Sequence, residues 1–130
     1  MPRNRTRLSV FLILLSLFAT GCSQSIDPAA TAVEKYLTAL VEKKQESLAA
    51  LSCADWEPNA QLEFDSFQAV NTRLENMSCS SKVAGDSAWL VNCTGSIVAT
   101  YNNEDQQLDL SVRTYRVINQ GGNFLVCGYE

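Results

Sequence analysis

Residues 27–53, DPAATAVEKYLTALVEKKQESLAALSC, are the stretch that decides the fold of this chain. Asp27 followed by Pro28 is typical of a helix start, because aspartate caps free backbone amides and proline fits the first helical turn. The apolar residues that follow recur at intervals of three and four positions, the period of one helix face. They are Ala30, Val33, Leu37, Leu40, Val41, Leu48 and Leu51. The pattern predicts one long amphipathic helix that ends at Cys53.

A second apolar stripe begins after the break at Asp55 and Pro58 and continues at helical spacing. Its members are Ala60, Phe64, Phe67, Val70, Leu74 and Met77. They predict one helix, or two short ones, ending near Asn76. Beyond Met77 the period changes to two, which predicts four antiparallel strands. The turns between them are expected at Gly85-Asp86, Asn102-Asn103 and Gly121-Gly122. The fold class is therefore α+β, with N-terminal helices packed on a curved antiparallel sheet.

The N-terminus is typical of an export signal. Three arginines precede the apolar run of residues 8–19, which is too short to cross a bilayer as a stable helix. The run ends in ATGC at residues 19–22, which resembles the lipobox of bacterial lipoproteins, although Ala19 stands where leucine is most usual. The resemblance implies removal of residues 1–21, lipidation of Cys22 with palmitate or similar acyl chains, and anchoring in the membrane. The alternative is ordinary secretion with Cys22 as a free thiol.

The same segment gives an expected domain organisation. Residues 22–26 form a short tether, and residues 27–130 form one domain. The lipid on Cys22 places that domain on the extracytoplasmic side of the cell envelope. Ser23 follows the cysteine where an aspartate would resemble an inner-membrane retention signal, so the outer membrane is expected in a host that has one.

Net charge excludes some classes of partner. Without residues 1–21 the chain keeps 7 of its 10 basic residues against 14 acidic residues. So acidic a domain repels nucleic-acid phosphates, and charge alone does not hold it to anionic lipid. We therefore expect the membrane contact to come from the lipid and expect no nucleic-acid partner.

Four further cysteines, Cys53, Cys79, Cys93 and Cys127, predict two disulfides in an exported domain, with three possible connectivities. A zinc site is the rival interpretation, but there is no CxxC spacing and no histidine. Cys93 and Cys127 lie two strands apart, farther than a disulfide spans. This favours Cys79 with Cys93 on neighbouring strands, and Cys53 with Cys127.

The order of a long helix, a second helical segment and an antiparallel meander resembles the nuclear transport factor 2-like superfamily. Residues 32–57 and the ending FLVCGYE resemble small uncharacterised bacterial lipoproteins of that superfamily. The resemblance implies a cone-shaped α+β domain. The superfamily holds enzymes such as ketosteroid isomerase and scytalone dehydratase, and also non-catalytic domains, so the fold does not choose a function.

The composition removes several kinds of catalytic site. With no histidine, Ser-His-Asp systems, histidine-ligated metals and the His-Asp pair of scytalone dehydratase are all excluded. An isomerase-like site would need a carboxylate in an apolar pocket and a phenol, for which Glu63 or Asp65 and Tyr36, Tyr101 or Tyr115 are the candidates. Each has a plainer interpretation. The acids solvate a helix, Tyr36 lies at the edge of the core, and Tyr115 falls on the polar face of its strand. We expect no catalytic residue, cofactor or metal.

Arg116 is a candidate for ligand binding. If the alternation of Leu108, Leu110 and Val112 continues, Arg116 points to the apolar face, where an arginine needs a carboxylate or an anionic ligand. The alternative is a strand bulge, or an arginine that reaches the rim of the sheet. Arg116, Tyr36 and Glu63 together form the expected ligand site.

Three functions follow from these observations. The one we favour is a non-catalytic module that binds an envelope protein or a small ligand. The others are an isomerase or lyase of the ketosteroid isomerase type, and a structural accessory domain that forms a homodimer through the sheet.

Overall fold

A computed structural model describes residues 25–130 of the chain. The signal segment and the lipidation site Cys22 lie outside the described residues. The elements in chain order are α1 (Pro28–Val41), α2 (Gln45–Ala50), α3 (Glu57–Ser66), β1 (Asn71–Val83), β2 (Ala88–Tyr101), β3 (Glu104–Asp109), the short 3-10 helix η1 (Leu110–Val112), β4 (Thr114–Gln120) and β5 (Asn123–Tyr129).

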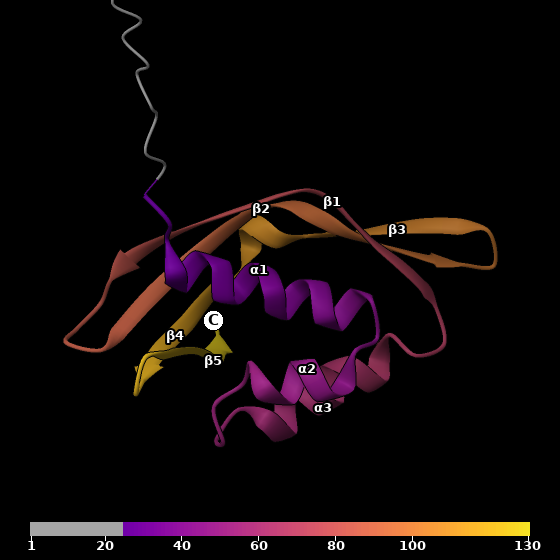
Figure 1. Ribbon diagram of the computed structural model, residues 1–130. Coiled ribbons are helices and arrows are strands. Elements are labelled where there is room, and N and C mark those ends of the chain that lie inside the picture. The colour runs from indigo at the N-terminus through magenta and orange to yellow at the C-terminus, as the bar shows by residue number, and fades with distance from the viewer. Residues whose placement is uncertain (1–24) are drawn as a thin grey trace, which may run out of the picture.

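Helix α1 lies in the hollow of a curved antiparallel sheet. Helices α2 and α3 cover the side of α1 that faces away from the sheet (Figure 1). It packs against β1, β2, β4 and β5. Its buried side chains are those that the apolar period predicts, including Val33, Leu37 and Leu40, each with no exposed area. They meet Val91, Val117 and Val126 of the sheet in one apolar core. The predicted class, α+β with helices packed on an antiparallel sheet, is confirmed.

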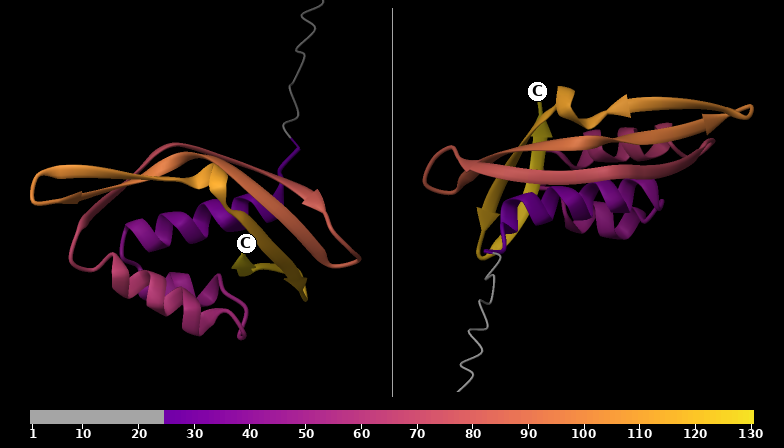
Figure 2. Two further views of the ribbon diagram at one scale, coloured as in Figure 1. Left: turned by 180° about the vertical axis from the view of Figure 1, so that it is seen from behind. Right: turned by 90° about the horizontal axis from the view of Figure 1, so that it is seen from above.

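The sheet has the strand order β1-β2-β4-β5, and β3 pairs with the far half of β2. A long β2 therefore serves two partners, β4 over Ala88–Asn92 and β3 over Ser96–Tyr101. Gly95 lies between the two halves with φ +93°, and a Cβ atom there would lie 2.4 Å from the Glu75 carbonyl oxygen. Only glycine allows the two strands to approach so closely at the bend. The two strands run through the sheet as long curved ribbons (Figure 2).

The prediction of one helix through residues 27–53 is wrong in its second half. Helix α1 ends at Val41, and Lys43 takes a left-handed conformation with φ 59° before α2 begins. The Lys43 ammonium donates hydrogen bonds to the carbonyl oxygens of Gln68 and Val70, at 3.1 and 2.9 Å, which fixes the turn. The turn folds α2 back against α3. The sequence has neither glycine nor proline at this turn, so a helix-period pattern runs through it unbroken.

The second helix is also shorter than predicted, because residues 71–76 belong to β1. The helical spacing of Leu74 and Met77 comes from a β-bulge. The register of β1 against β2 shifts between Glu75 and Ser78, and Asn76 has a φ of 52°. The extra residue moves the inward side chains from even to odd positions, so Leu74 and Met77 both reach the core.

The sheet has five strands where four were predicted. The apolar alternation of Leu108 and Leu110 does not continue, because η1 separates β3 from β4. The Asp109 carboxylate accepts a hydrogen bond of 2.8 Å from the Ser111 amide and starts this turn. Past it, Tyr115 is fully buried and Arg116 is exposed, the reverse of the predicted orientation.

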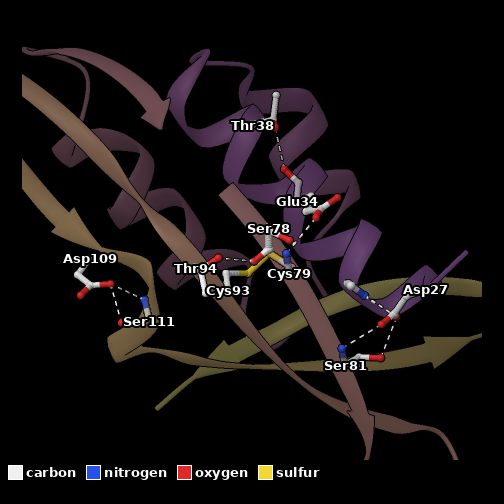
Figure 3. Close-up of a disulfide and its surroundings, with 11 residues drawn as sticks. Asp27, Glu34, Thr38, Ser78, Cys79, Ser81, Cys93, Thr94, Asp109 and Ser111 are labelled. Carbon is white, nitrogen blue, oxygen red and sulfur yellow. Dashed lines mark hydrogen bonds between the residues drawn. A yellow bond between two sulfur atoms is a disulfide. The ribbon is translucent and has the colours of Figure 1, made fainter. Parts of the chain in front are cut away.

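Two carboxylates of α1 satisfy the outer edge of β1 (Figure 3). Asp27 caps α1 by accepting from the Ala30 amide, and it also accepts from the amide and hydroxyl of Ser81. Glu34 accepts from the Cys79 amide at 3.1 Å. An edge strand presents free amides that invite another strand, and here side chains occupy two of them.

The two disulfides are Cys53–Cys127 and Cys79–Cys93, the pairs that strand spacing favours. The second joins residues directly opposite each other on β1 and β2. The first fastens the link between α2 and α3 to β5, with a Cα–Cα distance of 5.3 Å. Backbone hydrogen bonds support it on both sides, from Cys53 to Val126 and from Val126 to Leu51. From residue 25 onward, none of the helices has the length and apolar content needed to cross a membrane.

Candidate functional site

Glu63 of α3 is the centre of a hydrogen-bonded cluster between the helices and the sheet. Its Oε2 accepts from the Tyr36 hydroxyl of α1 at 2.9 Å. Its Oε1 accepts from the Arg113 guanidinium, just before β4, at 2.7 Å and from the Tyr129 hydroxyl of β5 at 3.0 Å. The side chain of Glu63 is 13% exposed and that of Arg113 is 27% exposed. Four distant segments of the chain therefore meet on one mostly buried carboxylate.

Aromatic rings surround this ion pair. The Trp56 indole donates to the Tyr36 hydroxyl at 3.1 Å and stacks edge-on against Tyr129, with ring centroids 5.3 Å apart. The Arg113 guanidinium lies 4.2 Å from the centre of the Tyr129 ring, within the range of a cation–π contact. Gly128 lies against the Trp56 ring and has a φ of +125°, a conformation that residues with a side chain rarely adopt.

The surroundings keep the phenols of Tyr36 and Tyr129 protonated. Burial, together with the negative charge of Glu63, raises the pKa of Tyr36 far above its usual value. The same two causes raise the pKa of Tyr129. Each phenol is therefore a hydrogen-bond donor to Glu63 at neutral pH, and neither is poised to lose its proton.

Tyr115 completes the aromatic group without joining the hydrogen bonds. Its ring lies 5.5 Å from that of Tyr129 and has no exposed area. Among the described residues its hydroxyl has no hydrogen-bond partner. Burial raises the pKa of this phenol, and the adjacent Arg113 guanidinium opposes the rise through polar contact with the hydroxyl and through its positive charge. An unpaired buried hydroxyl costs roughly 1–3 kcal/mol of stability.

The cluster can hold charge but is not arranged as a general base. Both oxygens of Glu63 already accept from groups that stay protonated, and one of these groups is a guanidinium. A base needs a free lone pair aimed at a substrate in a pocket. Two hollows lie beside the cluster. Other members of the cluster line them, but Glu63 does not. One of about 220 Å³ has Leu108, Val112 and Arg113 in its wall, and one of about 300 Å³ has Trp56 and Tyr129.

The predicted ligand site is brought together in part. Tyr36 and Glu63 are hydrogen-bonded to each other. Arg116 is not near them on the inner face, and this prediction is wrong because η1 shifts the parity of β4. Arg116 is exposed and lines the 300 Å³ hollow with Thr114 and Glu130. Tyr36 lies in the core with no exposed area, not at its edge.

The other isomerase candidates lie away from Glu63 or lack a partner. Asp65 accepts from the Gln61 amide at 2.8 Å on the exposed side of α3. Tyr101 is 59% exposed at the turn between β2 and β3. Tyr115 is buried, where its predicted place was the polar face of a strand. Glu63 with Tyr36 is the one predicted acid–phenol pair that the hydrogen bonds of the described residues join.

Three residues of the cluster were not found from the sequence: Trp56, Arg113 and Tyr129. A local signal for Arg113 does exist. Asp109 and Ser111 have the spacing at which an aspartate binds the amide two residues on, and such a turn ends the strand before Arg113. No comparable signal marks Trp56 or Tyr129, which meet Glu63 only through the tertiary fold. Within residues 25–130, no group of three or more His, Cys, Asp or Glu side chains is placed to hold a metal ion.

A second candidate surface lies where α1 begins. A hollow of about 610 Å³ is bounded by the start of α1, the end of α2 and the turn into β5. It is lined by Ile26, Pro28, Thr31, Ala32, Lys35, Ala50, Leu51, Gly122, Asn123, Phe124 and Leu125. We call this surface the tether face, because Ile26 is the last residue of the predicted tether.

No protein-family model matches the sequence, and no curated protein sequence matches it either. Solved structures do match. A protein of unknown function from Mycobacterium tuberculosis has a TM-score of 0.59 at 14% identity, and the match covers 76% of this chain and 65% of that one. The CamKII hub homology domain from Chlamydomonas reinhardtii has a TM-score of 0.56 at 15% identity, covering 78% and 92%.

A scytalone dehydratase-like protein from Novosphingobium aromaticivorans has a TM-score of 0.54 at 16% identity, covering 77% of each chain. At such low identity these likenesses show the fold and not the activity. The matched part is about two thirds of the mycobacterial protein. The hub domain and the dehydratase-like protein share the helices and the curved antiparallel sheet of one architecture. The fold of this chain is nuclear transport factor 2-like.

Proposed function

We propose that this chain is a non-catalytic binding module of a bacterial cell envelope, held outside the membrane by acyl chains on Cys22. The sequence ATGC at residues 19–22 supports the anchor. Two disulfides in so small a domain indicate an oxidising, extracytoplasmic compartment. The domain begins at α1, only a few residues after Cys22, so it stands close to the membrane.

The observation that carries the non-catalytic assignment is the state of Glu63. This is the acid that an isomerase of this fold would need as its base, and three donors occupy its two oxygens. Its geometry is that of a structural carboxylate, which ties α3 to α1, β4 and β5. The cluster holds the domain together at this end.

The same cluster presents a surface for a partner. Leu62 and Val112 are 68% and 74% exposed, and each directly precedes one member of the Glu63–Arg113 ion pair. Beside Val112 is the 220 Å³ pocket, which also contains Leu108 and Arg113. Its lining is mostly apolar, with Arg113 and Asp109 as its two charged members, and such a pocket is suited to an apolar side chain or the apolar group of a small ligand. We propose this as the binding surface.

The anchor is tested by the mass of the protein recovered from bacterial membranes. We expect the full chain to lose residues 1–21 and to carry a diacylglycerol on Cys22, and Cys22→Ala to remain unprocessed and unlipidated. An unmodified Cys22 in the membrane-bound protein would overturn the proposal. Digestion of intact cells or spheroplasts with an external protease then tests whether the domain lies on the outer side of the membrane.

The binding surface is tested by a photo-crosslinking residue placed at position 62 or 112 in the living envelope. We expect a specific adduct from both positions, and none from the exposed position 120 on the turn between β4 and β5. An Arg113→Ala background should weaken the adduct, because the arginine side chain forms part of the pocket wall. Equal labelling from all three positions would count against a defined surface.

An isomerase or lyase is the second candidate function, favoured by the hydrogen bond between Tyr36 and Glu63 and by the scytalone dehydratase-like fold neighbour. A panel of cyclic enones and hydroxy ketones tests it. Turnover that is lost in Glu63→Gln and kept in Arg116→Ala would replace the non-catalytic proposal. We expect no turnover by the wild-type protein.

A further inference from the structure

We infer that the tether face is the surface on which the domain rests against the lipid bilayer. This inference depends on the proposed lipid on Cys22. It fixes the orientation of the domain relative to the membrane. Three observations carry it: the length of the tether, the exposed apolar residues beside it, and the charge around them.

The tether length limits where the domain can stand. Four residue steps separate Cys22 from Ile26, and an extended chain covers at most about 14 Å over that length. Ile26 therefore stays close to the headgroup region of a bilayer that holds the acyl chains of Cys22, and α1 begins two residues later. The turn between β4 and β5 lies at this same end of the molecule, next to the start of α1 (Figures 1 and 2).

The surface that the tether holds there carries exposed apolar side chains among a few polar ones. Ile26 is 83% exposed, the most exposed of the large apolar side chains in residues 25–130. Phe124 and Leu125, partly exposed on β5, line the hollow beside it. Phe124 packs on Trp89, with ring centroids 4.9 Å apart, so its position is fixed by the sheet. Amphipathic surfaces of this kind bury their apolar residues about 5–10 Å deep at the boundary of headgroups and acyl chains.

The charge of this face differs from that of the rest of the domain. The chain has 14 acidic residues, and residues 25–130 contain all of them. No acidic side chain is among the described residues that line the hollow, and Lys35 is its one charged member. The acid of the neighbouring segment, Asp27, is turned away toward Ser81 of β1. Anionic lipid therefore repels the acidic surfaces of the domain, whereas the tether face has no acidic lining residue and can lie against the bilayer.

The test uses a weakened anchor, because two acyl chains would hide the contribution of the face. The mature chain from residue 22 has one free thiol when its other four cysteines are paired. A single myristoyl chain attached to Cys22 through a maleimide gives only marginal membrane binding, with a constant on the order of 10⁴ M⁻¹. Binding to sedimented vesicles of phosphatidylethanolamine and phosphatidylglycerol, 3:1, then reports on the face itself.

We expect Ile26→Asp to lower the partition coefficient about tenfold, because burial of an isoleucine side chain is worth at least that much. Lys35→Glu should lower it severalfold on these vesicles and leave binding to neutral phosphatidylcholine vesicles unchanged. Tyr101→Asp is the matched control, since Tyr101 is an exposed apolar residue at the turn between β2 and β3, away from α1.

Equal binding of Ile26→Asp and wild type would overturn the inference, and so would an equal loss in Tyr101→Asp. Either result would assign the face to a protein partner or to none. Circular dichroism on each variant verifies that its fold is intact. The lipid here is attached chemically, so the result does not depend on lipidation in the cell, and the two proposals can fail separately.

Discussion

At the scale of single residues, the burial of one negative charge organises the end of the domain where α3 meets the sheet. Glu63 accepts hydrogen bonds from a guanidinium and two phenols, and each of these donors comes from a different part of the chain. A buried charge pair contributes little when it is complete, but loss of one partner leaves the other uncompensated. The cluster is therefore most sensitive to removal of its cation.

Replacing Arg113 with alanine should lower the free energy of unfolding by roughly 2 kcal/mol, less than for a fully buried pair because Arg113 is 27% exposed. Arg116→Ala is the matched control, because Arg116 lies three residues further along, in β4, and is exposed. It should change stability by less than about 0.5 kcal/mol. Urea unfolding of both variants measures the difference. Equal losses would mean that the ion pair with Glu63 contributes nothing beyond the packing of an arginine.

The two buried phenols should respond to loss of their hydroxyl groups in opposite directions. Tyr115→Phe removes a hydroxyl that has no partner among the described residues, so stability should stay the same or rise by about 1 kcal/mol. Tyr36→Phe removes a hydroxyl that donates to Glu63 and accepts from Trp56, and should cost roughly 1–2 kcal/mol. Thermal and urea unfolding compare the pair. A loss in Tyr115→Phe as large as that in Tyr36→Phe would show that its hydroxyl is bonded in solution.

At the scale of elements, the sequence predicts what is periodic and fails where one residue changes the parity of a strand. The period of α1 and the alternation in β2 place the core correctly. The bulge at Asn76 makes Leu74 and Met77 look helical, and η1 exchanges the orientations of Tyr115 and Arg116. Two of the three residues predicted for the ligand site, Tyr36 and Glu63, lie together because both are on regular helices. The positions of Arg113 and Tyr129 depend on irregular junctions between strands. A pattern of apolar residues in the sequence does not predict such junctions.

The bend of β2 gives a prediction about Gly95. A Cβ atom at Gly95 would lie 2.4 Å from the Glu75 carbonyl oxygen, and Gly122 has the same φ of +93° with nothing within 4 Å. Gly122→Ala therefore measures the backbone strain alone, about 1 kcal/mol. Gly95→Ala adds a collision with the backbone of β1 and should cost at least about 2 kcal/mol more. The free energies of unfolding of the two variants provide the comparison. Similar losses would mean that β1 can move aside at its bulge.

The contact between α1 and β1 should depend on pH through Asp27. Burial works to raise the pKa of this carboxyl, but hydrogen bonds from Ala30 and Ser81 outweigh it and hold the pKa below its usual value. A carboxyl with a depressed folded-state pKa adds stability above its unfolded pKa of about 3.9, and that stability is lost as the pH falls through the folded value. Asp27→Asn keeps a helix cap without the charge.

The asparagine variant should therefore be less stable than wild type at pH 7 and should approach it as the pH falls below the unfolded pKa and through the lowered folded-state pKa of Asp27. Urea unfolding at a series of pH values across that range follows the gap between the two proteins. A gap that stays constant with pH would show that Asp27 acts through the shape of its hydrogen bonds and not through its charge.

At the scale of the whole molecule, two kinds of link close the cone. The Glu63 cluster joins α3 to the ends of β4 and β5, and Cys53–Cys127 joins the segment just before α3 to β5. The second disulfide, Cys79–Cys93, connects two strands that are already paired along their length. Their contributions to stability should differ, because they close loops of very different size.

Cys53–Cys127 spans 74 residues and Cys79–Cys93 spans 14. The chain-entropy model gives about 4 kcal/mol for the longer loop and about 3 kcal/mol for the shorter one. We expect the variant Cys53→Ala with Cys127→Ala to unfold at clearly lower urea concentration than the variant Cys79→Ala with Cys93→Ala. Both should keep the fold, because the backbone hydrogen bonds of Cys53 and Val126 remain when the longer disulfide is removed. A larger loss from the shorter loop would mean that Cys79–Cys93 holds β1 and β2 together more than their strand pairing does.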